Sequence, residues 1–136
     1  MAGEKCKINL YSTQKMGGEQ EQIMDQYQGS FIERENRRYL SYTRHSEDGE
    51  IDCLISFDRR SLSMTQKGAL RSKLELMPGK QTNNEYNTPF GMITLQVFTR
   101  RYEMIEQKNS FKLIIDYDII TGPDPIQTQM EIVVQF

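Results

Sequence analysis

A pair of carboxylates and several arginines are the side chains that could build a site. Asp116 and Asp118 stand two residues apart, so on a β-strand they would share one face about 7 Å apart. Such a pair could perform acid–base chemistry or hold a cation weakly. More often, this alternation marks the solvated side of a strand whose other side is buried. A functional role for the pair would be favoured if Asp118 faced the interior of the barrel.

Arginines lie on or beside segments rich in Tyr and Phe, and they are Arg34, Arg37, Arg38, Arg100 and Arg101. An inward-facing arginine could hold a carboxylate or phosphate through two hydrogen bonds. An outward-facing one would pair with Glu on a neighbouring strand, which is the commoner arrangement. Tyrosines could form a pocket wall with hydrogen-bonding tips, or pack the sheet and its rim. If a ligand is bound, we expect its contacts to be Tyr39, Tyr42, Arg100, Tyr117 and Asp118.

The remaining reactive side chains favour structure over catalysis. His45 is the only histidine, so no histidine-rich metal site can form, and its polar neighbours predict an exposed turn. Cys6 and Cys53 fall on apolar strand faces, where a free thiol behaves as a small hydrophobic group. A reactive thiol would need an electropositive, partly open setting. We predict no catalytic residue, no metal and no cofactor, and we regard an enzyme as the less favoured class.

Charge and hydropathy limit the classes of binding partner that the sequence favours. The net charge is −2, from 17 Lys+Arg against 19 Asp+Glu, which does not favour nucleic acid because such partners demand a basic face. No apolar run approaches the roughly 20 residues of a membrane span. The first residues lack the apolar core of a signal peptide. We therefore expect a cytoplasmic protein with reduced thiols and no membrane partner.

Alternation of apolar and polar residues predicts the strands that would position these groups. It is clearest from Ile51 to Phe57 and from Met130 to Phe136. Gly18–Gln28 and Arg101–Lys108 also contain good helix formers, but neither has an apolar stripe at helical period, so we expect strands there. With 136 residues and no linker or repeat, residues 1–136 are expected to form one domain.

Turn signals separate these segments at intervals typical of a β-meander. They include Gly17-Gly18, Glu35-Asn36, Asp48-Gly49 and the tetrad Thr88-Pro89-Phe90-Gly91. In the tetrad we expect a structured turn that starts a long strand, with Phe90 closing one end of the core. Many short antiparallel strands leave edges that barrel closure removes. The sequence predicts an all-β, up-and-down antiparallel barrel of about 8–10 strands, with a two-sheet sandwich as the alternative.

Short motifs in a fixed order carry a family resemblance: Tyr39-Leu40-Ser41-Tyr42, Lys67-Gly68-Ala69, Thr88-Pro89-Phe90-Gly91 and Leu113-Ile114-Ile115-Asp116-Tyr117-Asp118. In this set the chain resembles the YwiB-like family of small bacterial proteins, from about Ile8 to the C-terminus. The resemblance implies a calycin-like, that is lipocalin-like, β-barrel. It implies no catalytic or binding residues.

Two functional hypotheses follow. The first is a barrel that binds a small molecule in its interior, entered at the open end. The alternative is a non-enzymatic interaction or structural module with a filled core, which could act as a homodimer. Fold alone does not decide between them. The deciding feature is whether the barrel is hollow.

Overall fold

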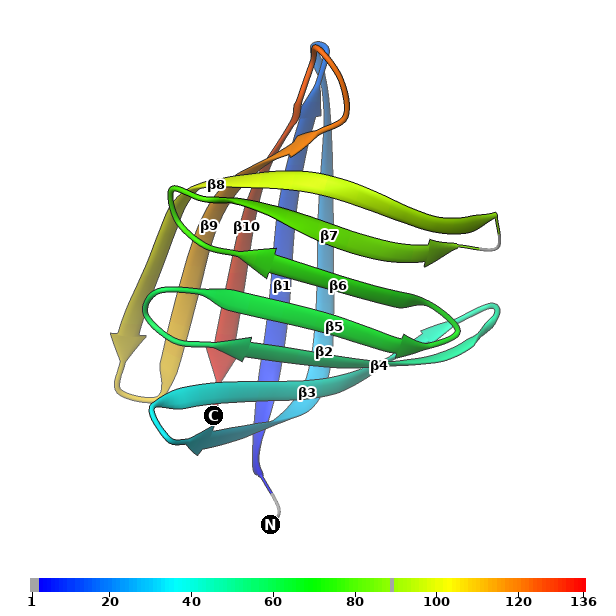
Figure 1. Cartoon of the computed structure of the whole chain (residues 1–136). Helices are drawn as coiled ribbons and strands as arrows, with labels where there is room; N and C mark the ends of the chain where they lie inside the picture. The colour runs from blue at the N-terminus through cyan, green and yellow to red at the C-terminus, as the bar shows by residue number, and fades with distance from the viewer. Residues whose placement is uncertain (1–2, 89) are drawn as a thin grey trace.

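The structure is a computed structural model that describes residues 3–88 and 90–136, and their regular elements are strands. The ten strands are β1 (Glu4–Met16), β2 (Glu19–Arg34), β3 (Arg37–Ser46), β4 (Gly49–Phe57), β5 (Leu62–Gly68), β6 (Arg71–Leu76), β7 (Gln81–Thr88), β8 (Gly91–Gln107), β9 (Ser110–Ile120) and β10 (Ile126–Gln135) (Figure 1). Each strand pairs antiparallel with its neighbours in sequence, and β1 pairs with β10. The chain is thus a closed up-and-down barrel, which confirms the predicted fold class.

Both segments with helix-forming composition are strands. Gly18–Gln28 falls almost entirely in β2, and Arg101–Lys108 forms the end of β8. Pairing with neighbouring strands has outweighed the local helix preference of Glu and Gln. Phe90 does not close the core as predicted, because its side chain is fully exposed. The residue before it, Pro89, lies outside the described residues, whereas the predicted long strand does start at Gly91.

The barrel is flattened into two layers whose strands cross. In Figure 1, β9, β10, β1 and the first part of β2 run lengthwise, and β3 to β7 cross them. Only β2 and β8 belong to both layers. β2 pairs with β1 as far as Phe31 and with β3 from Ser30 onward. β8 pairs with β7 from Gly91 to Phe98 and with β9 from Gln96 onward. These two strands therefore form the corners of the barrel.

Gly29 lies at the corner formed by β2. A Cβ at this position would lie 2.6 Å from the Ser41 carbonyl oxygen and 2.7 Å from Ile8 Cδ1. Both distances are far below van der Waals contact, so a side chain here would push β2 away from β3. The absence of a side chain lets the two layers approach each other where β2 passes between them.

The corner formed by β8 has a different device. The register against β9 shifts between Thr99 and Arg101, which makes Arg100 the extra residue of a bulge. The segment after β6 secures the bend: Gly79 N–H donates to the Thr99 carbonyl at 2.9 Å, and Thr99 N–H donates to the Lys80 carbonyl at 3.3 Å. A bulge sharpens the local bend of a strand, and here it carries β8 from one layer to the other.

Inward-facing side chains from both layers fill the barrel between these corners. The fully buried ones include Ile8, Leu40, Ile55, Phe57, Leu76, Leu113, Ile115, Ile132 and Val134. Phe57 of β4 and Phe111 of β9 meet across the layers with ring centroids 5.3 Å apart. This part of the interior is an apolar core and the main source of stability.

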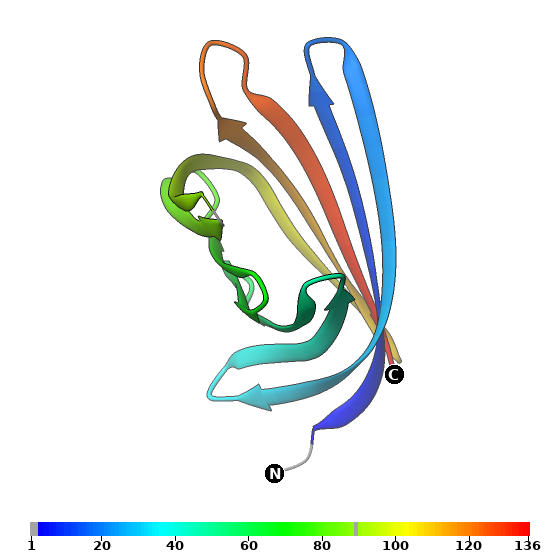
Figure 2. The ribbon, with the colours of Figure 1, turned by 90° about the vertical axis from the view of Figure 1, so that its right-hand side faces the viewer.

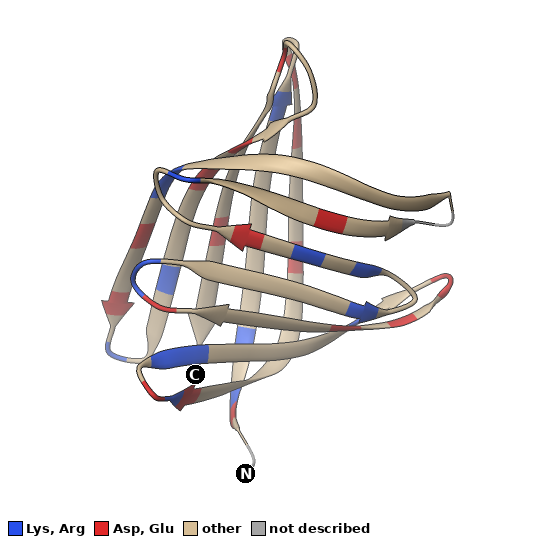
Figure 3. Cartoon of the chain, viewed as in Figure 1, with Lys and Arg blue, Asp and Glu red and all other residues tan. Residues whose placement is uncertain are grey.

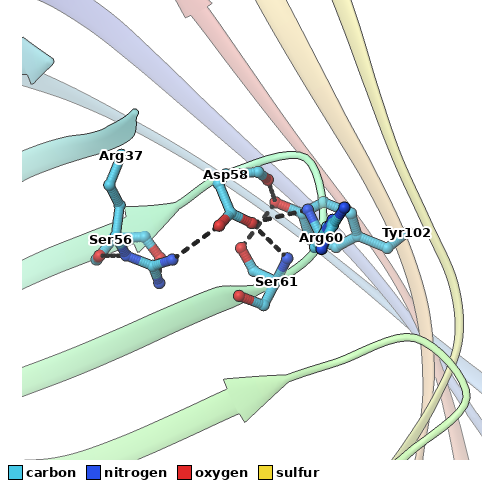
Figure 4. Close-up of polar contacts among 6 residues, drawn as sticks. All are labelled: Arg37, Ser56, Asp58, Arg60, Ser61 and Tyr102. Atoms are coloured by element: carbon cyan, nitrogen blue, oxygen red, sulfur yellow. Dashed lines mark hydrogen bonds and ion pairs between the residues drawn. The ribbon is translucent and has the colours of Figure 1, made fainter. Parts of the chain in front are cut away.

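A polar cluster closes the barrel where the β4–β5 turn meets β3 and β8 (Figure 4). Asp58 Oδ1 accepts hydrogen bonds from the backbone N–H of Arg60 at 2.7 Å and of Ser61 at 2.9 Å. Arg37 pairs with Asp58 at 3.3 Å, and the Tyr102 hydroxyl donates to the Asp58 carbonyl at 2.7 Å. Burial alone would raise the pKa of Asp58, but these N–H groups and the Arg37 charge outweigh it and lower that pKa.

Replacing Gly29 with Ala is expected to destabilise the protein by about 1–3 kcal/mol, the usual cost of forcing atoms into a packed site. Gln28→Ala, at the exposed neighbouring position, is the control and should change stability by less than about 0.5 kcal/mol. Urea unfolding followed by circular dichroism measures both. Equal stability of the two variants would contradict the proposed role of Gly29.

Stability is also expected to fall in acid as Asp58 is protonated. Because its folded-state pKa is lowered, Asp58 stabilises the protein above its unfolded-state pKa of about 4. That contribution is lost as the pH falls through the folded-state pKa. Asp58→Asn keeps the hydrogen-bonding shape but not the charge, so its unfolding temperature should depend less on pH below about pH 4. An unchanged pH dependence in this variant would contradict the assignment.

Candidate binding cleft

A lateral cleft opens where β2 and β3 separate. The pair Ser30–Ser41 is the last one that joins the two strands. Before Ser30, β2 pairs only with β1, and after Ser41, β3 pairs only with β4. The space between them has a volume of about 950 Å³. Its lining residues are Lys5, Gln26, Tyr27, Gln28, Gly29, Ser30, Ser41, Tyr42, Thr43, His45, Asp52 and Cys53. The cleft is thus a direct product of the β2 corner.

Two stacked tyrosines lie at the cleft. The rings of Tyr27 and Tyr42 have centroids 4.5 Å apart and planes 25° apart. Tyr42 is buried, and Tyr27 is half-buried with Arg44 as a hydrogen-bonding neighbour of its hydroxyl. Burial and then the charge of Asp25 raise the pKa of Tyr27, while Arg44 opposes them. Both phenols are therefore neutral hydrogen-bonding groups at physiological pH.

Cys53 lies on the inner face of β4 and is the cross-strand partner of Tyr42. Gln66 Nε2 donates to Cys53 Sγ at 3.8 Å, and the Ser72 hydroxyl donates to Gln66 Oε1 at 2.8 Å. Burial raises the pKa of Cys53, and burial followed by the charge of Glu4 raises that of Cys6. Both cysteines are free and buried, as the sequence predicts. Their protonated thiols are poor nucleophiles, so this part of the cleft has no activated nucleophile.

A second polar row crosses the inner face of the lengthwise layer. Tyr117 of β9 pairs with Thr99 of β8 on one side and with Thr128 of β10 on the other. All three are buried, and within the described part of the chain the hydroxyl of Thr99 has no hydrogen-bond partner, whereas Thr128 lies beside the Tyr117 hydroxyl. Burial of such groups is costly. Burial, and then the neighbouring Tyr86, raises the pKa of Tyr117.

The structure divides the predicted ligand contacts between the two faces of the barrel. Tyr42 and Tyr117 lie on the inner face. Tyr39 alternates with the buried Leu40 and so faces outward. Arg100 and Asp118 form an ion pair at 3.1 Å on the outer face, and are therefore not an interior site.

The β8 bulge explains why two consecutive arginines lie on the outer face. Because Arg100 is the extra residue, it and Arg101 both lie outside, and Arg101 lies 3.9 Å from Asp116. The carboxylate pair Asp116 and Asp118 is thus the solvated side of β9, matched to arginines of the neighbouring strand. The alternation of β9 alone could show this, but the bulge could not be read from the sequence.

The described residues include few other groups that could perform catalysis or bind a metal. His45 is exposed and lies 3.6 Å from Glu50 on the paired strand. Among residues 3–88 and 90–136, no three His, Cys, Asp or Glu side chains are close enough together to hold a metal ion. No helix in the described part of the chain is long and apolar enough to cross a membrane.

Sequence reasoning missed several of the cleft's features. It did not single out Arg44, nor the pairing of Tyr27 with Tyr42 across strands. The threonine row had a detectable signal, because Thr128 continues the apolar series Met130, Ile132 and Val134 at the same two-residue spacing. A polar residue in such a series predicts a polar group on the inner face.

Tyr117→Phe is expected to reduce the loss of stability in alkali. The folded-state pKa of Tyr117 is raised, so the neutral phenol stabilises the protein below its unfolded-state pKa of about 10. This contribution is lost as the pH rises toward the folded-state pKa, with a slope of about 1.4 kcal/mol per pH unit. Urea unfolding of both proteins from about pH 9 to about pH 11.5 measures the slope. Identical slopes after correction for the difference at neutral pH would contradict the burial of an unionised Tyr117.

Comparison with known proteins is consistent with this architecture. Residues 8–132 match the family model described as "Domain of unknown function (DUF1934)". The "Uncharacterized beta-barrel protein YwiB" of Bacillus subtilis (strain 168) is 22% identical over 117 residues, which are 86% of this chain and 82% of that protein. The crystal structure of the ywiB protein from Bacillus subtilis superimposes with a TM-score of 0.87 at 21% identity, covering 96% of this chain and 90% of that one. At this identity the likeness supports the barrel fold and not a ligand.

Proposed function

The chain belongs to the DUF1934 family, and we propose that it binds a small molecule in the cleft between β2 and β3, in the manner of a lipocalin-like barrel. The observation that carries the proposal is the stacked pair Tyr27–Tyr42 at the side of a cleft of about 950 Å³. Ligand pockets commonly have about 300–1,000 Å³, so the size is suitable. A planar ligand group would extend the existing stack of rings.

The packing of the interior supports a lateral position for such a ligand. Ile8, Leu40, Phe57 and Phe111 fill the barrel on the closed side, which leaves space at the open corner and not along the barrel axis. Polar groups there can fix its orientation, namely the Tyr27 hydroxyl, Arg44 and the backbone of the two unpaired strand edges. Tyr42 is the predicted contact that this proposal retains most directly.

Tyr117 and the threonine row lie farther along the same inner face. The unpartnered hydroxyl of Thr99 could form a hydrogen bond with a ligand that reaches it, which would remove the cost of its burial. Two free, buried cysteines also support the cytoplasmic location expected from the sequence, where thiols stay reduced.

Native mass spectrometry of freshly purified protein tests for a retained ligand, and binding of the uncharged planar probe N-phenyl-1-naphthylamine, followed by fluorescence, tests the cleft. Thr43→Trp places a bulky ring in the cleft without altering the core. It should weaken probe binding by about tenfold, equivalent to about 1.4 kcal/mol. Thr94→Trp, at an exposed position of β8 outside the cleft, is the matched control and should bind like the unaltered protein.

Two results would overturn the proposal. One is a protein that retains no small molecule and does not bind the probe. The other is equal probe binding by the Thr43→Trp and Thr94→Trp variants, since the probe would then occupy some other surface.

A further inference from the structure

The first part of β2 has a long edge that pairs with no strand in the described part of the chain. From Glu19 to Gly29, β2 pairs with β1 on one side, and β3 joins it only from Ser30 onward. Figure 2 shows this part of β2 at the margin of its layer. The backbone N–H and C=O groups on such an edge can form a ladder with another extended chain.

Apolar side chains on this edge are exposed on both faces of β2. Ile23 is 43% exposed and Met24 is 72% exposed. Ile23 lies between Glu21 and Asp25 in the row of side chains on the inner face of β2. Tyr27 continues the same row. An added strand would therefore meet an apolar residue flanked by two carboxylates on that face.

The edge is also strongly acidic. Residues 16–33 contain no Lys or Arg, and they include Glu19, Glu21 and Asp25. None of these three carboxylates takes part in an ion pair with the described residues. Across the open corner, the tip of the β3–β4 hairpin adds Glu47, Asp48 and Glu50 (Figure 3). Arg44 lies deeper, beside Tyr27. The edge strand itself is thus negative. Further cations lie on the neighbouring elements: Lys7 and Lys15 of β1 pair opposite Gln28 and Gln20, and Lys67 and Arg71 flank the β5–β6 turn.

We propose that β2 between Glu19 and Gln26 binds an extended basic peptide by strand addition. The backbone ladder supplies affinity, and side chains that alternate between faces supply specificity. On the inner face the peptide places cationic residues opposite Glu21 and Asp25 and an apolar residue opposite Ile23. Cross-strand pairs of opposite charge are stabilising, and like charges are not. The same carboxylates thus disfavour pairing of β2 with β2 of a second copy.

The probe is a fluorescein-labelled peptide, acetyl-Thr-Lys-Val-Val-Thr-Lys-Thr, with a partner peptide in which Glu replaces both Lys. Fluorescence anisotropy should show binding of the Lys peptide only. Asp25→Lys reverses the charge at an exposed position and should weaken that binding by about tenfold. Glu35→Lys makes the same charge change in the β2–β3 turn, away from this edge, and should change it by less than about twofold.

Methylation of backbone nitrogens tests the ladder itself. Methylating the alternate amides that face β2 should abolish binding, whereas methylating the other set should largely preserve it, because one edge of the peptide is engaged. Equal effects of both sets, equal loss in the Asp25→Lys and Glu35→Lys variants, or no binding of the Lys peptide would each overturn the proposal. So would a dimer in sedimentation analysis that Asp25→Lys dissociates, because a second copy would then occupy the edge. The Thr43→Trp test of the small-molecule cleft can succeed or fail separately.

Discussion

The passage of two strands between crossed layers is the constraint on which the other features depend. β2 must bend tightly against β3, and Gly29 permits this because no side chain separates Ile8 from the Ser41 carbonyl. β8 makes the equivalent turn through the bulge at Arg100. Once β2 has turned, its earlier part can no longer follow β3. The cleft and the free edge are therefore consequences of closing this barrel.

The two sides of the barrel differ in how their polar groups are satisfied. On the closed side, Asp58 accepts the N–H groups of the β4–β5 turn and pairs with Arg37, so the cluster is internally complete. On the open side, no described strand pairs with the edges of β2 and β3 beyond their point of separation, and Ile23 is exposed. Unsatisfied hydrogen-bonding groups and exposed apolar groups indicate surfaces that bind something. These features support the proposal that binding occurs at the open corner.

Period-two alternation was sufficient to predict the strands and the barrel, because burial of one face requires it. It also placed Cys6 and Cys53 on the inner face. It failed where an extra residue shifts the register of β8, so that Arg100 and Arg101 both lie outside. Asp118 faces outward by the regular alternation of β9 and pairs there with Arg100. The Tyr27–Tyr42 stack joins strands that separate nearby, and no local pattern reports such a contact. The Asp58 turn had a local signal, an Asp before its own turn, that the prediction did not use.

Amide hydrogen exchange along β2, followed by nuclear magnetic resonance, tests the central claim most directly. If β2 separates from β3 at Gly29, the amides from Glu19 to Gln28 should alternate between protected groups bonded to β1 and rapidly exchanging groups on the free edge. From Ser30 to Arg34, where β2 pairs with β3, protection should extend to the amides that point toward β3. Uniformly slow exchange along the whole of β2 would mean that its edge is covered, and would contradict an open corner.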